Sequence, residues 1–499
     1  MQETSEILNF YHSKNVFVTG GTGFLGKVLI EKLLRSTEVS NIYLLIRPKK
    51  EKDVYRRLEE LFECEIFDRI KKEQPKFEHR IKVIPGDCSH SGLGLSITDR
   101  QIITSDVNVI FHVAATVKFD ENLKRAFNTN VNGAKNVLEI AKHMKRLKAL
   151  IHVSTLYSNC YLEEIDEVFY KCPHSYDHVG ATLEKMNEFE AGELTPRIIG
   201  RWPNTYTFTK ALAENVIKDS AGTLPVGIFR PAVVVSTYNE PIPGWTDHMN
   251  GPAGVAAAAV SGVMRVIMCG SKDVADLVPV DTCVAGLVAT AWDVAQNHKK
   301  ADQTIPIYNY VSSTENPIMW REFSEYILVY GQDFPVRNAL WSAFMIMTKN
   351  PIVYFLLKSV LHVVPGLLVD GGRIIFGKKP KMMKIYKKVH RLSDTISFFL
   401  THTWKVSNDN TANLWCKLNQ RDKDLFPMSV RTVHWLTFFR NYIKGVRKYL
   451  LKDPDSTLQK ARKRNSFLNL MNAVSKLLLM FFLGNAVSWI FFILYRKLF

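Results

Sequence analysis

The chain has 499 residues, more than one ordinary hydrophobic core needs, and this favours two or three domains. Its 46% hydrophobic and 23% charged content is typical of a globular protein and excludes an intrinsically disordered one. The formal net charge of +17 indicates anionic partners. Because the sequence has no Cys/His zinc pattern and no RNP-type strand, we expect no nucleic acid among them, which leaves a lipid membrane or phosphate-bearing small molecules.

The seven cysteines are dispersed and form no CxxC pair, which fits reduced thiols better than a disulfide framework and predicts no metal site. The first residues, MQETSEILNFYHSK, lack the basic start and apolar stretch of a signal peptide. We therefore expect the catalytic body to lie in the cytosol.

Between Val16 and about Arg230, short apolar runs alternate with helical stretches. The runs lie at 16–18, 42–46, 81–86, 107–115, 149–155 and 226–235. This alternation predicts an α/β fold, a Rossmann-like doubly wound parallel sheet.

The first run leads into VTGGTGFLG, residues 18–26, and a helical stretch follows it. Glycines at this G-x-x-G-x-x-G spacing let the backbone turn tightly and bring its N–H groups against a pyrophosphate at a helix N-terminus. The alternative is a tight strand-to-helix turn without a ligand; the strand, loop, helix order favours the dinucleotide site. The cofactor-binding candidates in this loop are Thr19, Gly20, Gly23, Phe24, Leu25 and Gly26.

Arg47 follows the second run, where an NAD-selective site usually has an acidic residue that binds the ribose 2′-hydroxyl. Lys49 and Lys50 come next. Cations at this point suit a 2′-phosphate and predict NADPH; the alternative is an ordinary surface arginine.

Further cofactor-binding candidates come from the ends of later runs. Asp87 and Cys88 close the third run, where a short acidic side chain can reach the adenine. Small residues end the fourth run and would let the cofactor approach, although tight packing explains them equally well. The candidates of this second group are Asp87, Cys88, Ala114, Ala115, Val117, Arg230 and Pro231.

The clearest catalytic pattern combines Ser154-Thr155 at the end of the fifth run with Tyr206 and Lys210 on a following helix. Helical positions i and i+4 face the same way, so Tyr206 and Lys210 can share one site. An adjacent ammonium favours the phenolate, so we expect a lowered tyrosine pKa. A hydroxyl from Ser154 or Thr155 would orient a substrate carbonyl and stabilise the oxyanion formed by hydride transfer.

Together the glycine loop, the Ser-Thr strand end and YTFTK resemble the extended short-chain dehydrogenases/reductases. The stretches VTGGTGFLGKVLIEKLLR, IFHVAATVKFDENL, IHVSTLY, RWPNTYTFTKALAE, FRPAVVV and PGWTDHMNGPAG are similar to the alcohol-forming fatty acyl-CoA reductases. The resemblance runs from about Lys14 to about residue 450. One mild departure is Gly21, where alanine is usual.

This resemblance implies that NADPH reduces a long-chain fatty acyl-CoA to a primary alcohol in two hydride steps through a retained aldehyde, with release of coenzyme A. It implies that the three spaced glycines hold the pyrophosphate and Arg47 the 2′-phosphate. Lys210 would contact the nicotinamide ribose and Tyr206, and Tyr206 would be the proton donor. Related extended enzymes use the second residue of this pair as the third catalytic hydroxyl, which favours Thr155 over Ser154. The sequence alone leaves this choice open.

Two apolar segments lie in the second half of the chain. Residues 339–369 are broken by two lysines and two prolines, and they predict either a pair of buried helices or a face that lies on a membrane. Residues Leu477–Tyr495 carry no formal charge and, as a helix, would span ~28 Å, close to the ~30 Å hydrocarbon core. A buried soluble helix is the alternative for this second segment.

These patterns divide the chain into four predicted parts. They are a reductase domain over 1–335, an apolar membrane-proximal segment over 336–370, a mostly helical domain over 355–455 and a C-terminal membrane anchor over 468–499. The basic residues of the helical domain would meet either the coenzyme A phosphates or lipid headgroups. The organelle, either peroxisome or endoplasmic reticulum, and the oligomeric state stay open.

Two other functions are consistent with the dinucleotide loop. A membrane-bound dehydrogenase acting on a sterol hydroxyl would share the loop and the Tyr-Lys pair, but it would not need the domain over 355–455. A scaffold that only senses NADPH would not need Tyr206 and Lys210.

Overall fold

The computed structural model describes residues 4–48, 52–298 and 304–498. The chain forms two compact units, each assembled from three separate segments. The first unit contains Met1–Thr246, Asp273–Met319 and His402–Phe438. The second contains Asp247–Lys272, Trp320–Thr401 and Phe439–Phe499. These divisions differ from the predicted ones, because the chain leaves the first unit and returns to it twice. Lys49 and Lys50 lie outside the described residues.

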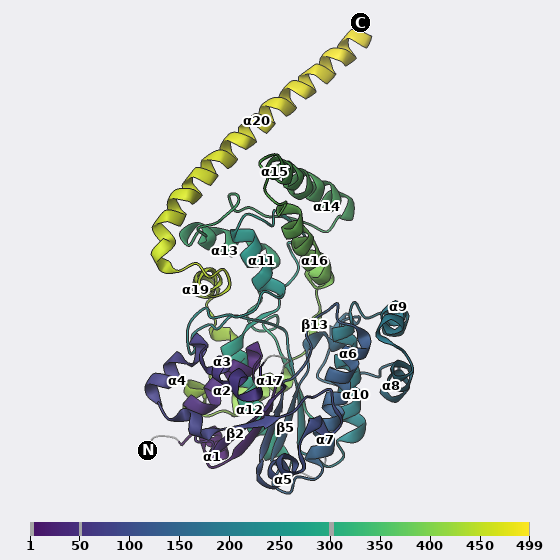
Figure 1. Cartoon of the computed structure of the whole chain (residues 1–499), viewed down its shortest axis with the longest axis vertical. Helices are drawn as coiled ribbons and strands as arrows, with labels where there is room; N and C mark the ends of the chain where they lie inside the picture. Colours follow the sequence, from purple (N-terminus) through teal and green to yellow (C-terminus); the bar gives the residue numbers. More distant parts are fainter. Residues whose placement is uncertain (1–3, 49–51, 299–303, 499) are drawn as a thin grey trace. The chain divides into compact units, whose positions relative to one another are not determined.

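The first unit is built on a seven-stranded sheet in which all neighbouring strands are parallel (Figure 1). Its apolar strands are buried on both faces, as a sheet covered on both sides requires. In sheet order the strands are β11 (Ile307–Tyr310), β7 (Val226–Pro231), β5 (Ala149–Val153), β4 (Val109–His112), β1 (Asn15–Thr19), β2 (Asn41–Ile46) and β3 (Ile81–Pro85).

This order confirms the Rossmann-like fold. The strand order reverses between β1 and β4, and ligands of such sheets bind beyond the carboxyl ends of the strands at that reversal. Right-handed crossovers on either side of the reversal put the helices on opposite faces. Accordingly α2 (Phe24–Ser36) packs beside α12 (Val280–Asn297), while α7 (Gly133–Ala141) packs beside α10 (Thr205–Ser220).

The core of the α7 and α10 side comes from alternate residues of the central strands. Phe17, Ile110, Leu150 and Ile228 point to this face and pack with apolar residues of the two helices. The other helices of this unit surround the sheet. They are α1 (Glu6–Tyr11), α3 (Val54–Phe62), α4 (Asp68–Glu73), α5 (Ile97–Asp106), α6 (Leu123–Phe127), α8 (Tyr176–Glu184), α9 (Glu188–Ile199), α17 (Asp409–Lys417) and α18 (Gln420–Leu425).

Two small parallel sheets complete the first unit, and both join distant parts of the chain. In one, β8 (Val233–Val235) pairs with β10 (Leu277–Pro279). In the other, β6 (Glu164–Ile165) pairs with β13 (Lys405–Val406), which belongs to the returning segment His402–Phe438.

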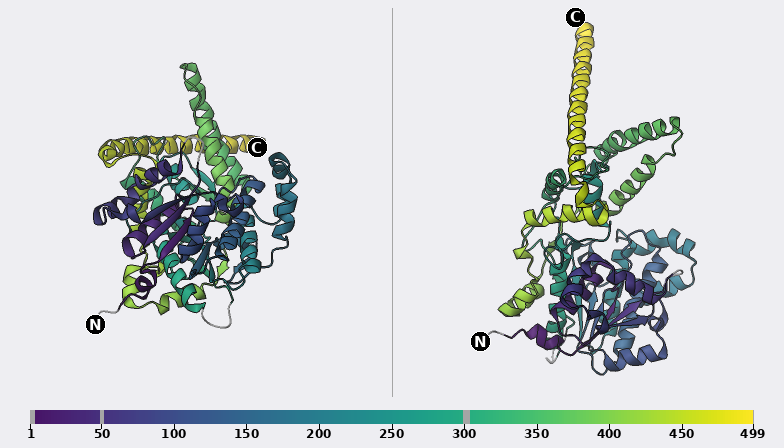
Figure 2. Two further views of the ribbon diagram at one scale, coloured as in Figure 1. Left: turned by 60° about the horizontal axis from the view of Figure 1, so that its bottom comes forward. Right: turned by 60° about the vertical axis from the view of Figure 1, so that its left-hand side comes forward.

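The second unit is mostly helical (Figure 2). Its two-stranded sheet pairs β9 (Val266–Met268) with β12 (Ile346–Thr348). Its helices are α11 (Gly251–Val260), α13 (Trp320–Asp333), α14 (Pro351–Lys358), α15 (Val364–Ile375), α16 (Met382–Thr401), α19 (Trp435–Gly445), which starts in the first unit, and α20 (Leu458–Leu498). All seven cysteines of the chain carry free thiols.

The apolar segments of the second unit are exposed. Among the described residues, one stretch, Pro351–Ile375, is long and apolar enough to cross a bilayer, with a mean hydropathy of 2.0 and only 17% of it buried. The alternative of two buried helices for this segment is therefore wrong. The apolar side chains described in the second half of α20 are also exposed, among them Leu477, Phe481 and Trp489.

Candidate active site

Tyr206 and Lys210 lie one turn apart on α10, on the side that faces the carboxyl end of β5. The helix begins at Asn204, whose side chain accepts a hydrogen bond from the Thr207 N–H at 2.9 Å. The Tyr206 ring stacks on Phe119, with ring centroids 5.7 Å apart. Tyr206 keeps part of its surface exposed, whereas Lys210 is buried. Tyr206 therefore lies at the edge of the enclosed site, with Lys210 inside it.

Ser154 and Thr155 follow β5 and point in opposite directions, as successive residues of an extended chain do. The Thr155 hydroxyl lies next to the Tyr206 phenol, within reach of a hydrogen bond. The Ser154 hydroxyl instead donates to Glu214 Oε1 at 2.5 Å. The structure thus brings Thr155, and not Ser154, together with Tyr206.

The pKa of Tyr206 differs from the sequence expectation. Burial raises it to about 12, and the hydrogen bond with Thr155 opposes this rise. Burial, and not Lys210, decides this pKa; the Lys210 ammonium donates to the Val153 carbonyl at 2.7 Å. At neutral pH Tyr206 therefore keeps its proton and is ready to donate it.

Burial also shifts the pKa of Lys210, but it lowers this pKa, because the charged form of a lysine is the protonated one. Burial lowers the pKa of Lys210 to about 8, while the carboxylate of Glu214 raises it. Two buried imidazoles, on His112 and His152, feel the Lys210 charge, and burial together with that charge lowers both pKa values, that of His112 to about 3. At neutral pH Lys210 is therefore still mostly an ammonium, and both histidines are neutral.

Arg230 lies behind this group. Its guanidinium holds Glu214 through two hydrogen bonds, at 2.9 Å from Nε and 2.6 Å from Nη2, and it donates to the Asp166 carbonyl from Nη1. The Arg230 side chain is fully buried. It holds the Glu214 carboxylate in place, and this carboxylate accepts the hydrogen bond from the Ser154 hydroxyl. Pro231 closes the same strand, β7.

The glycine loop has the geometry of a dinucleotide cradle. Gly20 has φ +76°, and a Cβ there would lie 2.6 Å from the Ala114 backbone nitrogen. A Cβ on Gly26 would overlap the Gly20 carbonyl. Gly23 caps α2 without a side-chain hydrogen bond, and the first turn carries no acidic residue. An anion is therefore favoured at this helix N-terminus.

Other residues of the loop are held by their neighbours. Thr19 Oγ1 accepts from the Ala114 N–H at 3.2 Å and lies 2.7 Å from His112 Nδ1. The Phe24 ring stacks on Trp245, with centroids 5.5 Å apart and planes within 18°. Leu25 is partly buried beside it.

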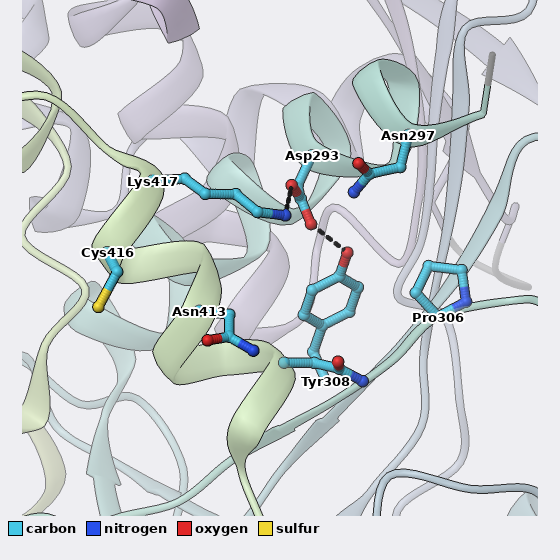
Figure 3. A pocket seen from close by; sticks show the side chains of 8 residues that line it. Asp293, Asn297, Pro306, Tyr308, Asn413, Cys416 and Lys417 are labelled. Carbon is cyan, nitrogen blue, oxygen red and sulfur yellow. Dashed lines mark hydrogen bonds and ion pairs between the residues drawn. The ribbon is translucent and has the colours of Figure 1, made fainter. Parts of the chain in front are cut away.

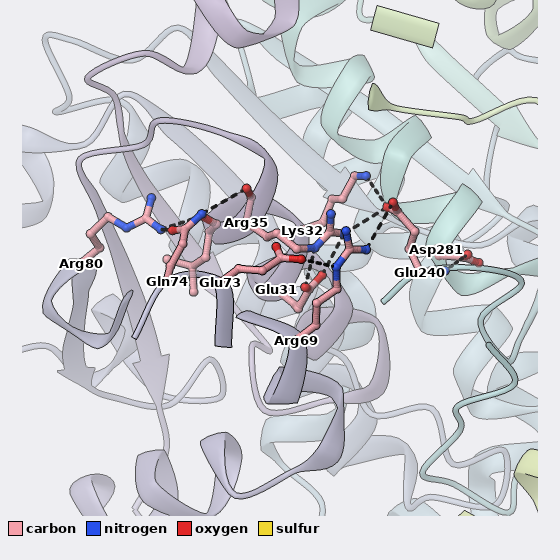
Figure 4. A network of polar contacts seen from close by, with 10 residues as sticks. Glu31, Lys32, Arg35, Arg69, Glu73, Gln74, Arg80, Glu240 and Asp281 are labelled. Atoms are coloured by element: carbon pink, nitrogen blue, oxygen red, sulfur yellow. Dashed lines mark hydrogen bonds and ion pairs between the residues drawn. The ribbon is translucent and has the colours of Figure 1, made fainter. Parts of the chain in front are cut away.

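The loop that carries Trp245 is fixed to α2 by charge (Figure 4). Glu240 accepts hydrogen bonds from Lys32 at 2.5 Å and from Arg35 at 3.0 Å. Burial raises the pKa of Glu240, but the two cations outweigh it and lower the pKa to about 2. Asp281 adds three hydrogen bonds from the backbone N–H groups of residues 238–240. The loop over residues 238–245 is thus held by α2 and α12 at its start and by the Phe24 ring at Trp245.

Arg47 lies beside a second arginine that sequence reasoning missed. Arg57, on α3, donates to Thr22 Oγ1 of the glycine loop at 3.2 Å and to the Arg47 carbonyl. Burial and the charge of Arg47 lower the pKa of Arg57. Two arginines therefore lie close together beside the glycine loop, after the second strand. The only signal in the sequence was a basic pair, Arg56 and Arg57, on the helix after the second strand.

The remaining candidates lie around the same edge of the sheet. Asp87 lies 3.5 Å from Arg47 and accepts two hydrogen bonds from Ser89 at 2.9 Å each. Cys88 is buried, and burial raises the pKa of its thiol to about 12. Ala114 and Ala115 are partly buried and follow β4, and Val117 is about half exposed.

A separate pocket of about 440 Å³ lies at the start of β11 (Figure 3). Asp293 in this pocket accepts hydrogen bonds from Tyr308 at 2.6 Å and Lys417 at 2.8 Å. The pocket contains none of the predicted site residues. Its lining residues are Asp293, Asn297, Pro306, Tyr308, Asn410, Asn413, Cys416 and Lys417.

Comparison with known proteins decides the family. Two family models, both described as "Male sterility protein", match residues 18–287 and 361–453. The chain is 44% identical to "Fatty acyl-CoA reductase wat" of Drosophila melanogaster, covering 95% of this chain and 91% of that protein. It is 38% identical to "Fatty acyl-CoA reductase 1" of Rattus norvegicus, covering 92% and 88%. The chain belongs to the fatty acyl-CoA reductase family.

This membership makes the protein an oxidoreductase with a nicotinamide cofactor domain. Solved structures with related folds include the terminal R domain from the myxalamid PKS-NRPS biosynthetic pathway, at a TM-score of 0.56 and 18% identity over 91% of this chain and 97% of that chain. The reductase (R) domain of a non-ribosomal peptide synthetase from Mycobacterium tuberculosis gives 0.57 and 17% over 88% and 92%. At these identities the likeness concerns the fold alone. The fatty acyl-CoA reductase resemblance of the sequence is confirmed.

Proposed function

We propose that this protein reduces long-chain fatty acyl-CoA to a primary fatty alcohol with NADPH, releasing coenzyme A and retaining the aldehyde between two reduction steps. The observation that carries the proposal is the position of Thr155 next to the Tyr206 phenol, with Lys210 one turn further along α10, at the carboxyl edge of the parallel sheet. Relatives named fatty acyl-CoA reductases over most of the chain support the substrate class.

NADPH is the proposed cofactor, and the residues of the cradle fit it. Gly20 and Gly26 let the loop pack closely against β4 and against the first turn of α2, and the N–H groups at the start of α2 would meet a pyrophosphate. Arg47 and Arg57 offer two guanidinium groups to a 2′-phosphate, which favours NADPH over NADH.

The chain's own groups position and protonate the substrate. The bound nicotinamide supplies one hydride for the thioester and a second, from a fresh cofactor, for the aldehyde. Thr155 and Tyr206 hydrogen-bond the carbonyl oxygen, and Tyr206 donates its proton to the oxyanion that develops there. When the C–S bond breaks, the hydroxyl of the hemithioacetal returns its proton to Tyr206 and coenzyme A leaves as a thiolate. Tyr206 donates this proton again when the aldehyde becomes the alcohol. Lys210 keeps a positive charge next to this site, which would stabilise the phenolate that Tyr206 becomes between its proton transfers.

The membrane is the second proposed partner. Residues 468–499 would anchor the protein in a peroxisomal or endoplasmic reticulum membrane through the apolar half of α20, with the first unit in the cytosol. The proposal is supported by the exposure of the apolar side chains described there. Such an anchor would keep the enzyme beside the lipid that supplies its substrate and takes its product.

The test is NADPH oxidation by the full chain in detergent with C14 to C24 acyl-CoAs, with products identified by gas chromatography. We expect two NADPH per fatty alcohol. Tyr206→Phe should abolish most of the rate and keep NADPH affinity, because the phenol donates a proton and does not hold the cofactor. Aldehyde released at one NADPH would contradict the retained intermediate. Turnover of hydroxysteroids but of no acyl-CoA would overturn the substrate assignment.

A further inference from the structure

The segment Pro351–Ile375, formed by α14, a short π-helical turn and α15, turns its polar side chains inward. Tyr354, His362 and Asp370 are all buried, at intervals of eight residues, on the face that packs against α16. Gly366, on the same face, lies directly against the Tyr386 ring. The hydrogen-bond partners on or before α16 are Ser393 for Tyr354 (3.1 Å), His390 for His362 (3.1 Å), and the N–H groups of Lys381, Met382 and Met383 for Asp370 (2.7 to 2.9 Å).

The outward face of this segment is apolar. A helix on the surface of a soluble protein shows the reverse arrangement, with apolar residues toward the core and polar ones toward water. A contiguous exposed apolar surface of this kind marks a contact with a membrane or another protein. Its large exposed side chains are Ile352, Val353, Phe355, Leu356, Val360, Val364, Leu367, Leu368, Val369, Ile374, Ile375 and the following Phe376.

The fold does not allow this segment to cross the bilayer. The chain turns after Phe376 and runs back along α15 as α16. α16 exposes Lys384, Lys387, Lys388 and Arg391, and charged side chains are costly at the bilayer centre. Because the return helix cannot cross, the apolar segment must lie along the surface of one leaflet.

The charges next to the apolar face identify the kind of surface. Residues 371–393 contain no Asp or Glu. Basic residues that flank an inserted apolar face attract anionic lipid headgroups, each by ~1 kcal/mol. The exposed lysines of the turn and of the first half of α16 are Lys378, Lys379, Lys381, Lys384, Lys387 and Lys388.

We propose that residues 351–388 form an interfacial hairpin that inserts its apolar face into one leaflet of an anionic phospholipid membrane without crossing it. In both views of Figure 2 the hairpin of α14, α15 and α16 extends away from the rest of the second unit, as such insertion requires. The inference rests on the membrane association in the proposed function and adds a second, reversible contact to the anchor.

Depth-resolved quenching in the full chain tests the insertion. The partly or fully exposed native thiols are first removed as Cys64→Ser, Cys172→Ser and Cys416→Ser. Single cysteines at Ile352, Val360 and Ile374 then carry an environment-sensitive dye in phosphatidylcholine and phosphatidylserine vesicles containing brominated lipids, with Lys387→Cys as the matched control. We expect equal shallow quenching at the three apolar positions and little at Lys387.

Each other pattern overturns the proposal. Deepest quenching at Val360, with shallow quenching at Ile352 and Ile374, would mean a transmembrane span. No lipid quenching at any of the three would mean that protein, such as a second copy of this chain, covers the face. These readouts do not depend on turnover, so an inactive protein that still shows the expected pattern would contradict the proposed function alone.

Charge reversal tests the lipid class. Lys378→Glu, Lys379→Glu and Lys381→Glu together should lower quenching at Val360 by about twofold or more when phosphatidylserine is present, and change nothing in pure phosphatidylcholine. The control reverses three exposed lysines of the first unit, Lys72, Lys76 and Lys145. Equal effects of the two triple variants, or no effect of either, would contradict recognition of anionic headgroups by the hairpin.

Discussion

Ser154 and Thr155 are neighbours in sequence, yet they serve different partners. Thr155 meets Tyr206, whereas Ser154 donates to Glu214. We expect Thr155→Val to lower kcat by about 10²-fold, because it removes a donor that stabilises the developing oxyanion. Ser154→Ala should change kcat by less than about tenfold but lower the free energy of unfolding by about 1–3 kcal/mol, since a buried carboxylate loses a donor. Steady-state rates and denaturant unfolding separate the two effects, and Thr155→Ser should restore most of the rate.

The buried ammonium of Lys210 predicts a basic limb in the pH profile. With a pKa lowered to about 8, Lys210 is protonated below this pH and neutral above it, so kcat/KM should fall as the pH rises through about 8. Lys210→Arg keeps its charge at all working pH values and should remove this limb even at a reduced rate. A limb that stays at the same pH in Lys210→Arg would assign the titration to another group.

The lowered pKa of Lys210 acts on stability with the opposite sign. Unfolded, the side chain returns to its usual pKa near 10.4, so between about pH 8 and 10 the unfolded chain binds more protons than the native one. The contribution of Lys210 to stability therefore rises with pH over the window in which activity falls.

Arg57 predicts cofactor selectivity. Arg57→Ala should raise KM for NADPH by about tenfold and leave KM for NADH nearly unchanged, because the proposed partner of this guanidinium is the 2′-phosphate, which NADH lacks. Arg56→Ala is the matched control, since Arg56 pairs with Glu59 at 3.0 Å on the exposed side of α3. Equal losses with both cofactors would show that Arg57 only supports the glycine loop through Thr22.

At the level of elements, the glycine loop offers a pair of substitutions with opposite expected outcomes. A Cβ on Gly21 would meet the flexible end of Ile30 at 2.9 Å, which can move, so Gly21→Ala should keep NADPH affinity. A Cβ on Gly26 would overlap the backbone of Gly20, so Gly26→Ala should abolish cofactor binding. Fluorescence titration with NADPH measures both. Normal binding by Gly26→Ala would contradict the close approach of α2 to the loop.

The sequence predicted strands and helices correctly where the pattern lies within one short segment. The apolar runs predicted six of the seven strands of the sheet, all except β11, and the spacing of Tyr206 and Lys210 predicted a shared helix face. It could not choose between Ser154 and Thr155, because the choice depends on how the backbone turns after β5. It also missed the burial that raises the pKa of Tyr206, because burial depends on packing across the sheet. Arg57 was missed because its contact with Thr22 joins elements 35 positions apart.

At the scale of the whole molecule, the chain crosses between its two units several times. No local pattern shows that His402–Phe438 returns to the first unit. There α17 packs against β11, and two side chains bind that strand: Asn410 Nδ2 donates to the Ile307 carbonyl at 2.8 Å and Thr411 Oγ1 to the Asn309 carbonyl at 2.9 Å. Lys417 adds an ion pair with Asp293. The returning segment therefore covers β11, the strand at one edge of the sheet.

This interleaving predicts how the chain tolerates shortening. A protein ending at residue 401 lacks the cover of β11 and should aggregate or lose cooperative unfolding and NADPH binding. One ending at residue 475 keeps the returning segment and the part of α20 held by Asn469 and Asn472, which bond to Ser342 and Trp341. It should unfold cooperatively and bind NADPH like the full chain. Thermal unfolding with and without NADPH compares the two.

A point variant separates the loss of the cover from the loss of the second unit. Asn410→Ala with Thr411→Val in the full chain removes only two hydrogen bonds to β11, and it should lower the free energy of unfolding of the first unit by about 2–4 kcal/mol. The chain ending at residue 401 could instead bind NADPH normally, and the double variant could be as stable as the parent. The sheet would then not need the returning segment for its stability. The expected result instead makes residues 402–438 a structural part of the cofactor-binding unit, so that this unit folds only after most of the chain is available.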